Sequence, residues 1–237
     1  MPPDWLSAVA WIYLFTCFVC SAVIGYDIVF GHRRQPMGVM NLVFPITALY
    51  FGPAALAFYW RWGRVGRGRV GPRAARSPTP MAGAEMPRPR WVTMAIEVSH
   101  CGSGCALGDL ISEWVIYAFA FAVAGHVLFA EYIGDYVLAV AFGIVFQYFA
   151  IAPMRGLGLG DGLKAAAKAD VISLTFFEIG LFGWMALMAF VFFPAPHQLM
   201  TNSAAFWFLM QIGMMIGFAT SWPANVWLIK RGIKVPM

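Results

Sequence analysis

The feature that most constrains this chain is a series of long apolar segments, each long enough to cross a membrane. A bilayer-spanning helix needs about 20 mostly apolar residues. Charged residues make up only 11% of the chain, whereas a soluble domain carries about 25%. These properties predict an all-α integral membrane protein, a helical bundle with about six transmembrane helices. The expected spans are 5–30, 39–60, 105–127, 133–152, 170–193 and 204–229.

A segment rich in Gly, Pro and Arg, residues 61–90, separates the second and third spans. It shows no apolar period, so we interpret it as a flexible linker. It divides the chain into a two-span unit, 1–60, and a four-span bundle, 91–237, which we expect to carry the function. Residues 91–99 are expected to lie at the membrane interface before the third span.

The basic residues indicate an orientation. Eight arginines fall within 61–90, and cytoplasmic loops carry the excess of Lys and Arg. With six spans, this places both termini in the cytoplasm and leaves only Arg33 and Arg34 outside, where they would bind lipid headgroups or pair with Asp27. We therefore expect a multi-pass protein of the plasma (inner) membrane whose linker contacts anionic lipid headgroups. The net charge of +5 gathers beside a span, so no nucleic-acid partner is expected.

The third span opens with an unusual polar run, HCGSGCALGDLISEW, residues 100–114. Residues spaced by four lie along one face of a helix, and two stripes follow this spacing. The polar stripe consists of Cys101, Cys105, Asp109 and Glu113. The neighbouring stripe of small residues consists of Gly104, Gly108 and Ser112. Small residues allow another helix to approach closely, so we expect the polar stripe inside the bundle.

The fifth span carries two more carboxyl groups, Asp170 and Glu178. Glu178 lies eight residues into its span and Glu113 eight residues beyond Cys105, about 12 Å along each helix, so the two glutamates should lie at similar depth. A charge at the bilayer centre costs at least about 2.5–3.5 kcal/mol, and no Lys or Arg lies deep in an expected span. The carboxyls should be protonated, share a proton or bind a cation.

The residues at the start of the third span favour a metal cation. Imidazole and thiolate ligands suit zinc, copper or iron, and carboxylates extend the choice to iron and manganese. The leading hypothesis is a membrane protein that binds or transports a transition-metal cation, rather than an enzyme. Its expected metal ligands are His100, Cys101, Cys105, Asp109, Glu113, Asp170 and Glu178.

Other functions stay open at this stage. Iron held by carboxylates and histidine would make a membrane redox enzyme, although di-iron bundles use a Glu-x-x-His pair, which no expected span contains. Without a metal, the same carboxyls would serve a proton-coupled transporter or an assembly factor. The cysteines would then be small packing residues and the carboxyls a protonated pair. Assembly into a homo-oligomer is open as well.

Two further groups are interpreted as structural. Cys17 and Cys20 share a face of the first span, where packing is favoured over a relay of Cu(I) ligands. His126, Glu131 and Asp135 bracket the short turn between the third and fourth spans. We expect these three residues in water.

The polar run belongs to a wider resemblance. The runs SHCGSGCALGDLISEW, GDGLKAAAKADVISLTFFEIGLFGW and SWPANVWLIKRGIK resemble the domain of unknown function 4396 family of prokaryotic membrane proteins. The second expected span also resembles part of the N-terminal pair of spans that accompanies this domain in the family. The resemblance covers most of the chain except the arginine-rich linker. It implies a polytopic membrane protein with the His-Cys-x-x-x-Cys motif as its signature, and it implies no settled reaction.

Overall fold

The computed structural model describes residues 2–65, 89–156 and 158–234, without the side chains of 151–155. Every named element in these ranges is a helix, so the expectation of an all-α protein is confirmed. The elements are α1 (Asp4–Val29), α2 (Met40–Phe51), α3 (Pro53–Phe58), the π-helical turn η1 (Tyr59–Gly63), α4 (Arg90–Phe119), α5 (Val127–Arg155), α6 (Leu159–Leu187), the π-helical turn η3 (Met188–Phe192) and α7 (Ala204–Lys230).

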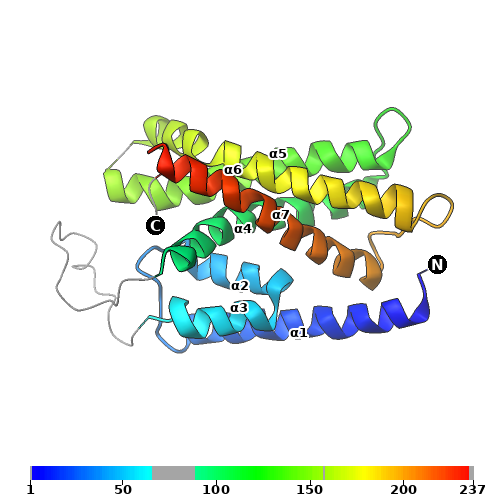
Figure 1. Cartoon of the computed structure of the whole chain (residues 1–237), viewed down its shortest axis with the longest axis horizontal. Helices are drawn as coiled ribbons and strands as arrows, with labels where there is room; N and C mark the ends of the chain where they lie inside the picture. Colours follow the sequence, from blue (N-terminus) through cyan, green and yellow to red (C-terminus); the bar gives the residue numbers. More distant parts are fainter. Residues whose placement is uncertain (1, 66–88, 157, 235–237) are drawn as a thin grey trace.

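Four of the described helices are long and apolar enough to cross a membrane. They are Asp4–Val29, Val127–Ala150, Leu159–Phe192 and Ala204–Lys230. Four apolar helices of this length are typical of a membrane protein. The fifth long helix, α4, has 30 residues and runs alongside the others (Figure 1), but its polar stripe lowers its hydropathy. Its apolar neighbours cover that stripe, since α4 packs on α2, α5, α6 and α7.

The second apolar segment is a hairpin that turns back inside the bundle. Gly52 separates α2 from α3 and has a φ of +53°, a conformation that favours glycine. A Cβ built there would lie 2.8 Å from Cys17 Sγ, so the turn sits directly on α1. Pro53 then occupies the first turn of α3, where a missing N–H costs nothing. The expected second span is therefore wrong, because Gly52 reverses the chain halfway.

An ion-pair clamp holds the two ends of this hairpin together. Arg64, just after η1, donates to both carboxylate oxygens of Asp27, at 2.7 and 3.0 Å. The Tyr59 hydroxyl donates to the same carboxylate at 3.0 Å. Arg33, just before α2, donates to the Val65 carbonyl at 2.8 Å. Both ends of the hairpin thus lie beside the C-terminal end of α1.

The hairpin changes the topology of the chain. We call the end of the bundle that holds Val65 and Pro89 the linker end, and the opposite end, with connections 120–126 and 193–203, the loop end. Because the hairpin returns to the linker end, the N-terminus lies at the loop end and the C-terminus at the linker end (Figure 1). The described ranges thus contain five long helices, of which four are long and apolar enough to cross a membrane. The first and last helices leave the two ends of the chain at opposite ends of the bundle (Figure 1).

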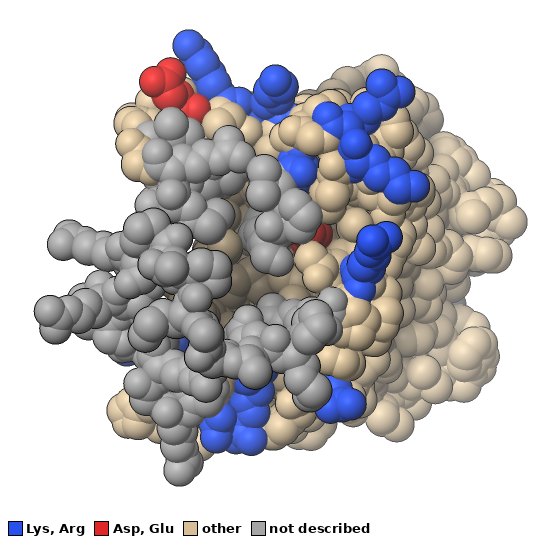
Figure 2. Space-filling view, turned by 60° about the vertical axis from the view of Figure 1, so that its left-hand side comes forward, with Lys and Arg blue, Asp and Glu red and all other residues tan. Residues whose placement is uncertain are grey.

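The linker end is basic. Figure 2 looks onto this end and shows Lys and Arg gathered around it. Arg33 and Arg34, expected on the far side, lie at this end because α1 ends here and the hairpin returns residues 61–65 to the same end. The described residues of this end include Arg33, Arg34, Arg61, Arg64, Arg90, Lys164, Lys168, Lys230, Arg231 and Lys234.

The helix α4 begins at Arg90 and ends at Phe119, whereas the sequence suggested 105–127. Residues 91–99 continue this helix instead of lying at an interface. The reason is the spacing of Val92 and Ile96, which puts both on the buried face, at 0% and 4% exposure. Trp91 packs edge-on against Trp62 of the hairpin. The polar stripe therefore starts well inside a continuous helix.

Candidate cation site

The contact between α4 and α5 is close enough to bring backbone against backbone. A Cβ built on Gly104 would lie 2.8 Å from the α5 backbone, and one on Gly108 would lie 2.5 Å from it. Farther along, the Ser112 hydroxyl fills the space that a side chain at Gly134 would need. These small residues let the two helices touch, and the touching backbones fix the position of the polar stripe on α4.

Three of the expected ligands meet toward the linker end. One ligand atom each from His100, Cys101 and Asp170 lie within 4.8 Å of one another. All three residues are fully buried. The Cys101 thiol donates to Asp170 Oδ1 at 2.7 Å, and the His100 ring packs edge-on against the Phe146 ring of α5. Imidazole, thiolate and carboxylate together could hold a zinc, copper or iron ion.

A lysine that sequence reasoning placed at the surface reaches this cluster. Lys234 is 2% exposed. Its Nζ donates to Asp170 Oδ1, to Cys101 Sγ and to Asn225 Oδ1, each at 3.0 Å. It also lies 3.5 Å from a carboxylate oxygen of Glu97. Burial alone would lower the pKa of Lys234, but the negative charge of Asp170 and the further contacts with Cys101 and Glu97 outweigh it and raise that pKa above its ordinary value.

The end of α7 explains how Lys234 gets there. Gly232 follows the last helical turn with a φ of +68°. Its N–H donates to the Ile229 carbonyl, and the Ile233 N–H donates to the Leu228 carbonyl, each at 3.0 Å. This is the Schellman arrangement that ends many helices at a glycine. It folds residues 233–234 back toward the bundle. The run LIKRGIK carried this signal, since Gly after a helical Lys-Arg pair is a typical stop.

A network of small polar groups supports the lysine. The Asn225 amide nitrogen donates to the Ser173 hydroxyl and to the Ser221 carbonyl. The Ser173 and Ser221 hydroxyls are 3.0 Å apart. The network therefore orients the Asn225 oxygen toward Lys234, and it links α6 to α7 next to the cluster.

The other expected ligands lie deeper in the bundle. Cys105, Asp109, Glu113 and Glu178 are 0–1% exposed. Asp109 has no hydrogen-bond partner among the described residues, and in those residues no Lys or Arg forms an ion pair with Asp109, Glu113 or Glu178. Glu178 lies beside the Cys105 thiol, and Asp109 lies within electrostatic reach of both glutamates. Each step of four residues along α4 rises about 6 Å. The polar stripe therefore lines the interior of the bundle toward the loop end.

Asp135 joins this group, contrary to the sequence interpretation. It was expected in a watery turn, but α5 begins at Val127, so Asp135 lies inside the helix and is fully buried. It faces α4 near Ser112 and Glu113. In the part of the chain that the structure describes, Asp135 likewise forms no ion pair with Lys or Arg.

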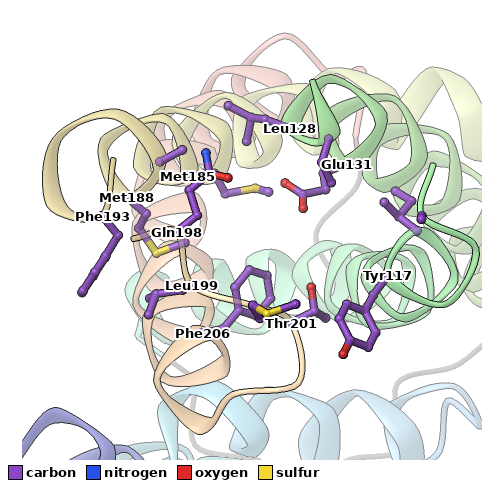
Figure 3. Close-up of a pocket in the computed structure, with 15 residues that line it drawn as sticks. Tyr117, Leu128, Glu131, Met185, Met188, Phe193, Gln198, Leu199, Thr201 and Phe206 are labelled. Atoms are coloured by element: carbon purple, nitrogen blue, oxygen red, sulfur yellow. The ribbon is translucent and has the colours of Figure 1, made fainter. Parts of the chain in front are cut away.

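A cavity of about 330 Å³ lies at the loop end. The Glu131 carboxyl points into it toward Met185 (Figure 3). Thr201, which also lines the cavity, lies beside Glu113. The cavity thus borders the deep end of the polar stripe. We call the series of carboxyls from the lysine cluster to this cavity the acidic column: Asp170, Glu178, Asp109, Glu113, Asp135 and Glu131.

The buried charges do not balance. Five side chains of the acidic column, on α4, α5 and α6, are 0–1% exposed, and Lys234, at 2%, is the one buried Lys or Arg among the described residues. An isolated carboxylate is very costly in a low-dielectric interior. The excess negative charge must therefore be neutralised by protons or by bound cations. The five acidic residues are Asp109, Glu113, Asp135, Asp170 and Glu178.

All four cysteines are buried and none forms a disulfide. Cys17 supports the hairpin turn at Gly52, which gives it a packing role. Cys17 and Cys20 lie on α1, outside the cluster at His100. Only the pair on α4 therefore belongs to the candidate site.

Comparison with known proteins agrees with the sequence resemblance. No curated protein and no solved structure matches the chain. A family model does match, over residues 90–234. This range begins with α4, ends with Lys234 and contains every residue of the acidic column. The match covers more than half of the chain, which therefore belongs to the family described as domain of unknown function (DUF4396).

Proposed function

We propose that the protein is a multi-pass plasma-membrane protein that binds transition-metal cations and passes them along the acidic column. The observation that carries the proposal is the run of buried carboxyls which, apart from Asp170, form no ion pair with Lys or Arg among the described residues. Ionisable residues within a membrane mark ion pathways and proton relays. A run that stretches from a basic end to a cavity at the other end suits movement of a cation better than a structural ion pair.

The donor atoms support a transition metal as the cation. At the linker end, the His100 imidazole and the Cys101 sulfur offer nitrogen and sulfur ligands beside the Asp170 carboxyl. Magnesium and calcium prefer oxygen ligands alone, whereas copper, zinc and iron accept this mixture. The Cys105 thiol beside Glu178 would offer the next site along the path. The carboxyls of α4 and α5 would lead from there to the cavity.

The proposed orientation places the linker end in the cytoplasm. Positive residues concentrate in cytoplasmic loops, and the Lys and Arg of the described residues gather at this end. The arginine-rich linker would contact anionic headgroups of the inner leaflet; residues 66–88 lie outside the described part of the chain. The cavity at Glu131 would then open toward the opposite side of the membrane.

One observation favours a second candidate, a proton-coupled transporter without a metal. The middle of the column, at Asp109, Glu113 and Asp135, offers carboxyl groups alone. Such a series suits proton transfer, since carboxyl chains form proton relays in pumps and transporters. The two candidates differ in whether the His100–Cys101–Asp170 cluster holds a metal.

The metal content of the purified protein tests the proposal. The full chain is loaded with Zn²⁺, Co²⁺ or Cu⁺ in detergent, freed of excess ion and analysed by mass spectrometry. Near-stoichiometric metal is expected in the wild type and in Cys20→Ser, a buried cysteine on α1. The metal should be lost in Cys101→Ser and Asp170→Asn. A wild type that retains no metal under reducing conditions would exclude metal binding and leave the proton path.

A further inference from the structure

The ammonium of Lys234 stands where a metal ion would bind. Two of the three candidate ligand atoms, Cys101 Sγ and Asp170 Oδ1, each lie 3.0 Å from Lys234 Nζ. A zinc ion lies about 2.3 Å from thiolate sulfur and about 2.0–2.2 Å from carboxylate oxygen. An ion bonded to both ligands would lie within a few ångströms of the ammonium. The lysine and the metal therefore compete for the same two ligand atoms, Cys101 Sγ and Asp170 Oδ1.

Charge strengthens this competition. Two cations a few ångströms apart in a buried site repel each other strongly, because little water screens them. The protonated Cys101 thiol donates a hydrogen bond to Asp170, whereas a metal binds the deprotonated thiolate. The arrangement with Lys234 in place thus stabilises the metal-free form of the cluster.

We propose that Lys234 is a tethered cation that must leave the cluster before a metal ion binds, so that the C-terminal turn gates the site at the linker end. The inference rests on the proposed function, since it assigns the regulation of that same site. Metal arrival and lysine release are one exchange: the metal takes the thiolate of Cys101 and the carboxylate of Asp170, the thiol proton goes to solvent, and the ammonium moves out.

The C-terminal turn is suited to this movement. Lys234 is separated from α7 only by the residues 231–233. Lys230 and Arg231 are exposed, so the turn lies at the surface of the linker end. Rotation about Gly232 can withdraw the lysine without moving α7, because glycine accepts many backbone conformations. Asn225 stays in place on α7, where its side-chain oxygen can accept a hydrogen bond from another donor.

Cobalt binding tests the exchange. Co²⁺ bound to a cysteine thiolate produces a charge-transfer absorption, which reports ligation by Cys101 in the full chain. Lys234→Gln is expected to bind Co²⁺ at least about tenfold more tightly than the wild type, equivalent to about 1.4 kcal/mol. Lys230→Gln removes an exposed lysine one turn away and should bind like the wild type. Equal or weaker binding by a folded Lys234→Gln protein would overturn the proposal.

A second measurement uses the wild type and does not depend on folding of the variant. Amine-acylating reagent is applied with and without saturating Co²⁺, and modification of Lys234 is measured by mass spectrometry, with Lys230 as the internal reference. Lys234 should be protected without metal and modified at least about fivefold faster with it. Cobalt ligation by Cys101 that leaves Lys234 protected would refute the exchange.

The failure of this inference is distinguishable from failure of the proposed function. If the wild type binds Co²⁺ through Cys101 and Lys234 stays protected, metal binding stands and the gate is wrong. If neither the wild type nor Lys234→Gln shows the charge-transfer absorption, the metal site itself is wrong, and the gate with it.

Discussion

The substitution Gly108→Ala is the most direct test of how the polar stripe is positioned. The added Cβ would lie 2.5, 2.7 and 2.8 Å from three backbone atoms at Leu138 and Ala139. Backbone atoms inside a helix cannot turn away as a flexible side chain can. The two helices must therefore separate by several tenths of an ångström, and the carboxyls beside Gly108 must move with α4.

Two opposing effects set the size of the change. Overpacking of a well-packed contact costs about 1–3 kcal/mol, whereas replacing a helical glycine by alanine stabilises a helix by up to about 1 kcal/mol. The net destabilisation should be about 1–2 kcal/mol. For a chain of this size, 1 kcal/mol lowers the Tm by about 2–4 °C, so we expect a decrease of about 2–8 °C.

Thermal unfolding in detergent measures this change, with Gly183→Ala as the matched control. Gly183 lies in α6, is exposed, and its added Cβ would meet nothing within 4 Å. Its Tm should stay the same or rise slightly. If Gly108→Ala unfolds at the same temperature as Gly183→Ala, the close α4–α5 contact does not hold the stripe in place, and the reasoning is refuted.

Three further results are expected. Gly52→Ala should destabilise the hairpin by about 1–3 kcal/mol, since an alanine at this φ is strained; a Tm unchanged from that of the wild type would contradict the hairpin turn. Asp27→Asn should cost about 1 kcal/mol by weakening the bidentate pair with Arg64, seen as a Tm lower by a few degrees, while the surface variant Asp161→Asn should not change it. A hydrophilic maleimide should leave all four buried cysteines unlabelled in the folded protein and should label them after unfolding. Rapid labelling of the folded Cys20→Ser variant would contradict this expectation, because it would show that one of the three remaining cysteines is open to solvent.

The sequence was sufficient where the pattern was local. Spacing by four on α4 predicted that Asp109 and Glu113 share a face, and both are buried. The same spacing placed Gly108 on the neighbouring stripe, where it lies against α5. These inferences depend only on helical geometry, so they did not require knowledge of the partners of α4.

The prediction of the topology was wrong where a single backbone conformation decides the course of the chain. An apolar segment of about 20 residues looks the same whether it crosses the membrane or turns back halfway. The choice depends on the positive φ of Gly52 and on the clamp between Asp27 and Arg64. Neither is visible in hydropathy, and the error placed the N-terminus at the linker end of the bundle instead of the loop end.

Lys234 and Asp135 were misplaced for a different reason. Lys234 lies beyond the last span and Asp135 near the start of one, so both were assigned to water. In the structure, a glycine turn returns Lys234 to the bundle, and an earlier start of α5 buries Asp135. Boundaries of helices are the least reliable part of a prediction from sequence, and here they decided which charges meet.

Transport by protein reconstituted into liposomes tests the central claim most directly. Uptake of Zn²⁺ and of protons is followed with internal dyes for the wild type, Glu178→Gln and the exposed control Asp161→Asn. The account predicts zinc uptake by the wild type and by Asp161→Asn. It predicts a loss of at least about tenfold in rate, equivalent to about 1.4 kcal/mol, in Glu178→Gln, because buried ionisable residues mark the ion path. Zinc uptake by Glu178→Gln at the rate of the wild type would contradict the claim that the acidic column carries the cation.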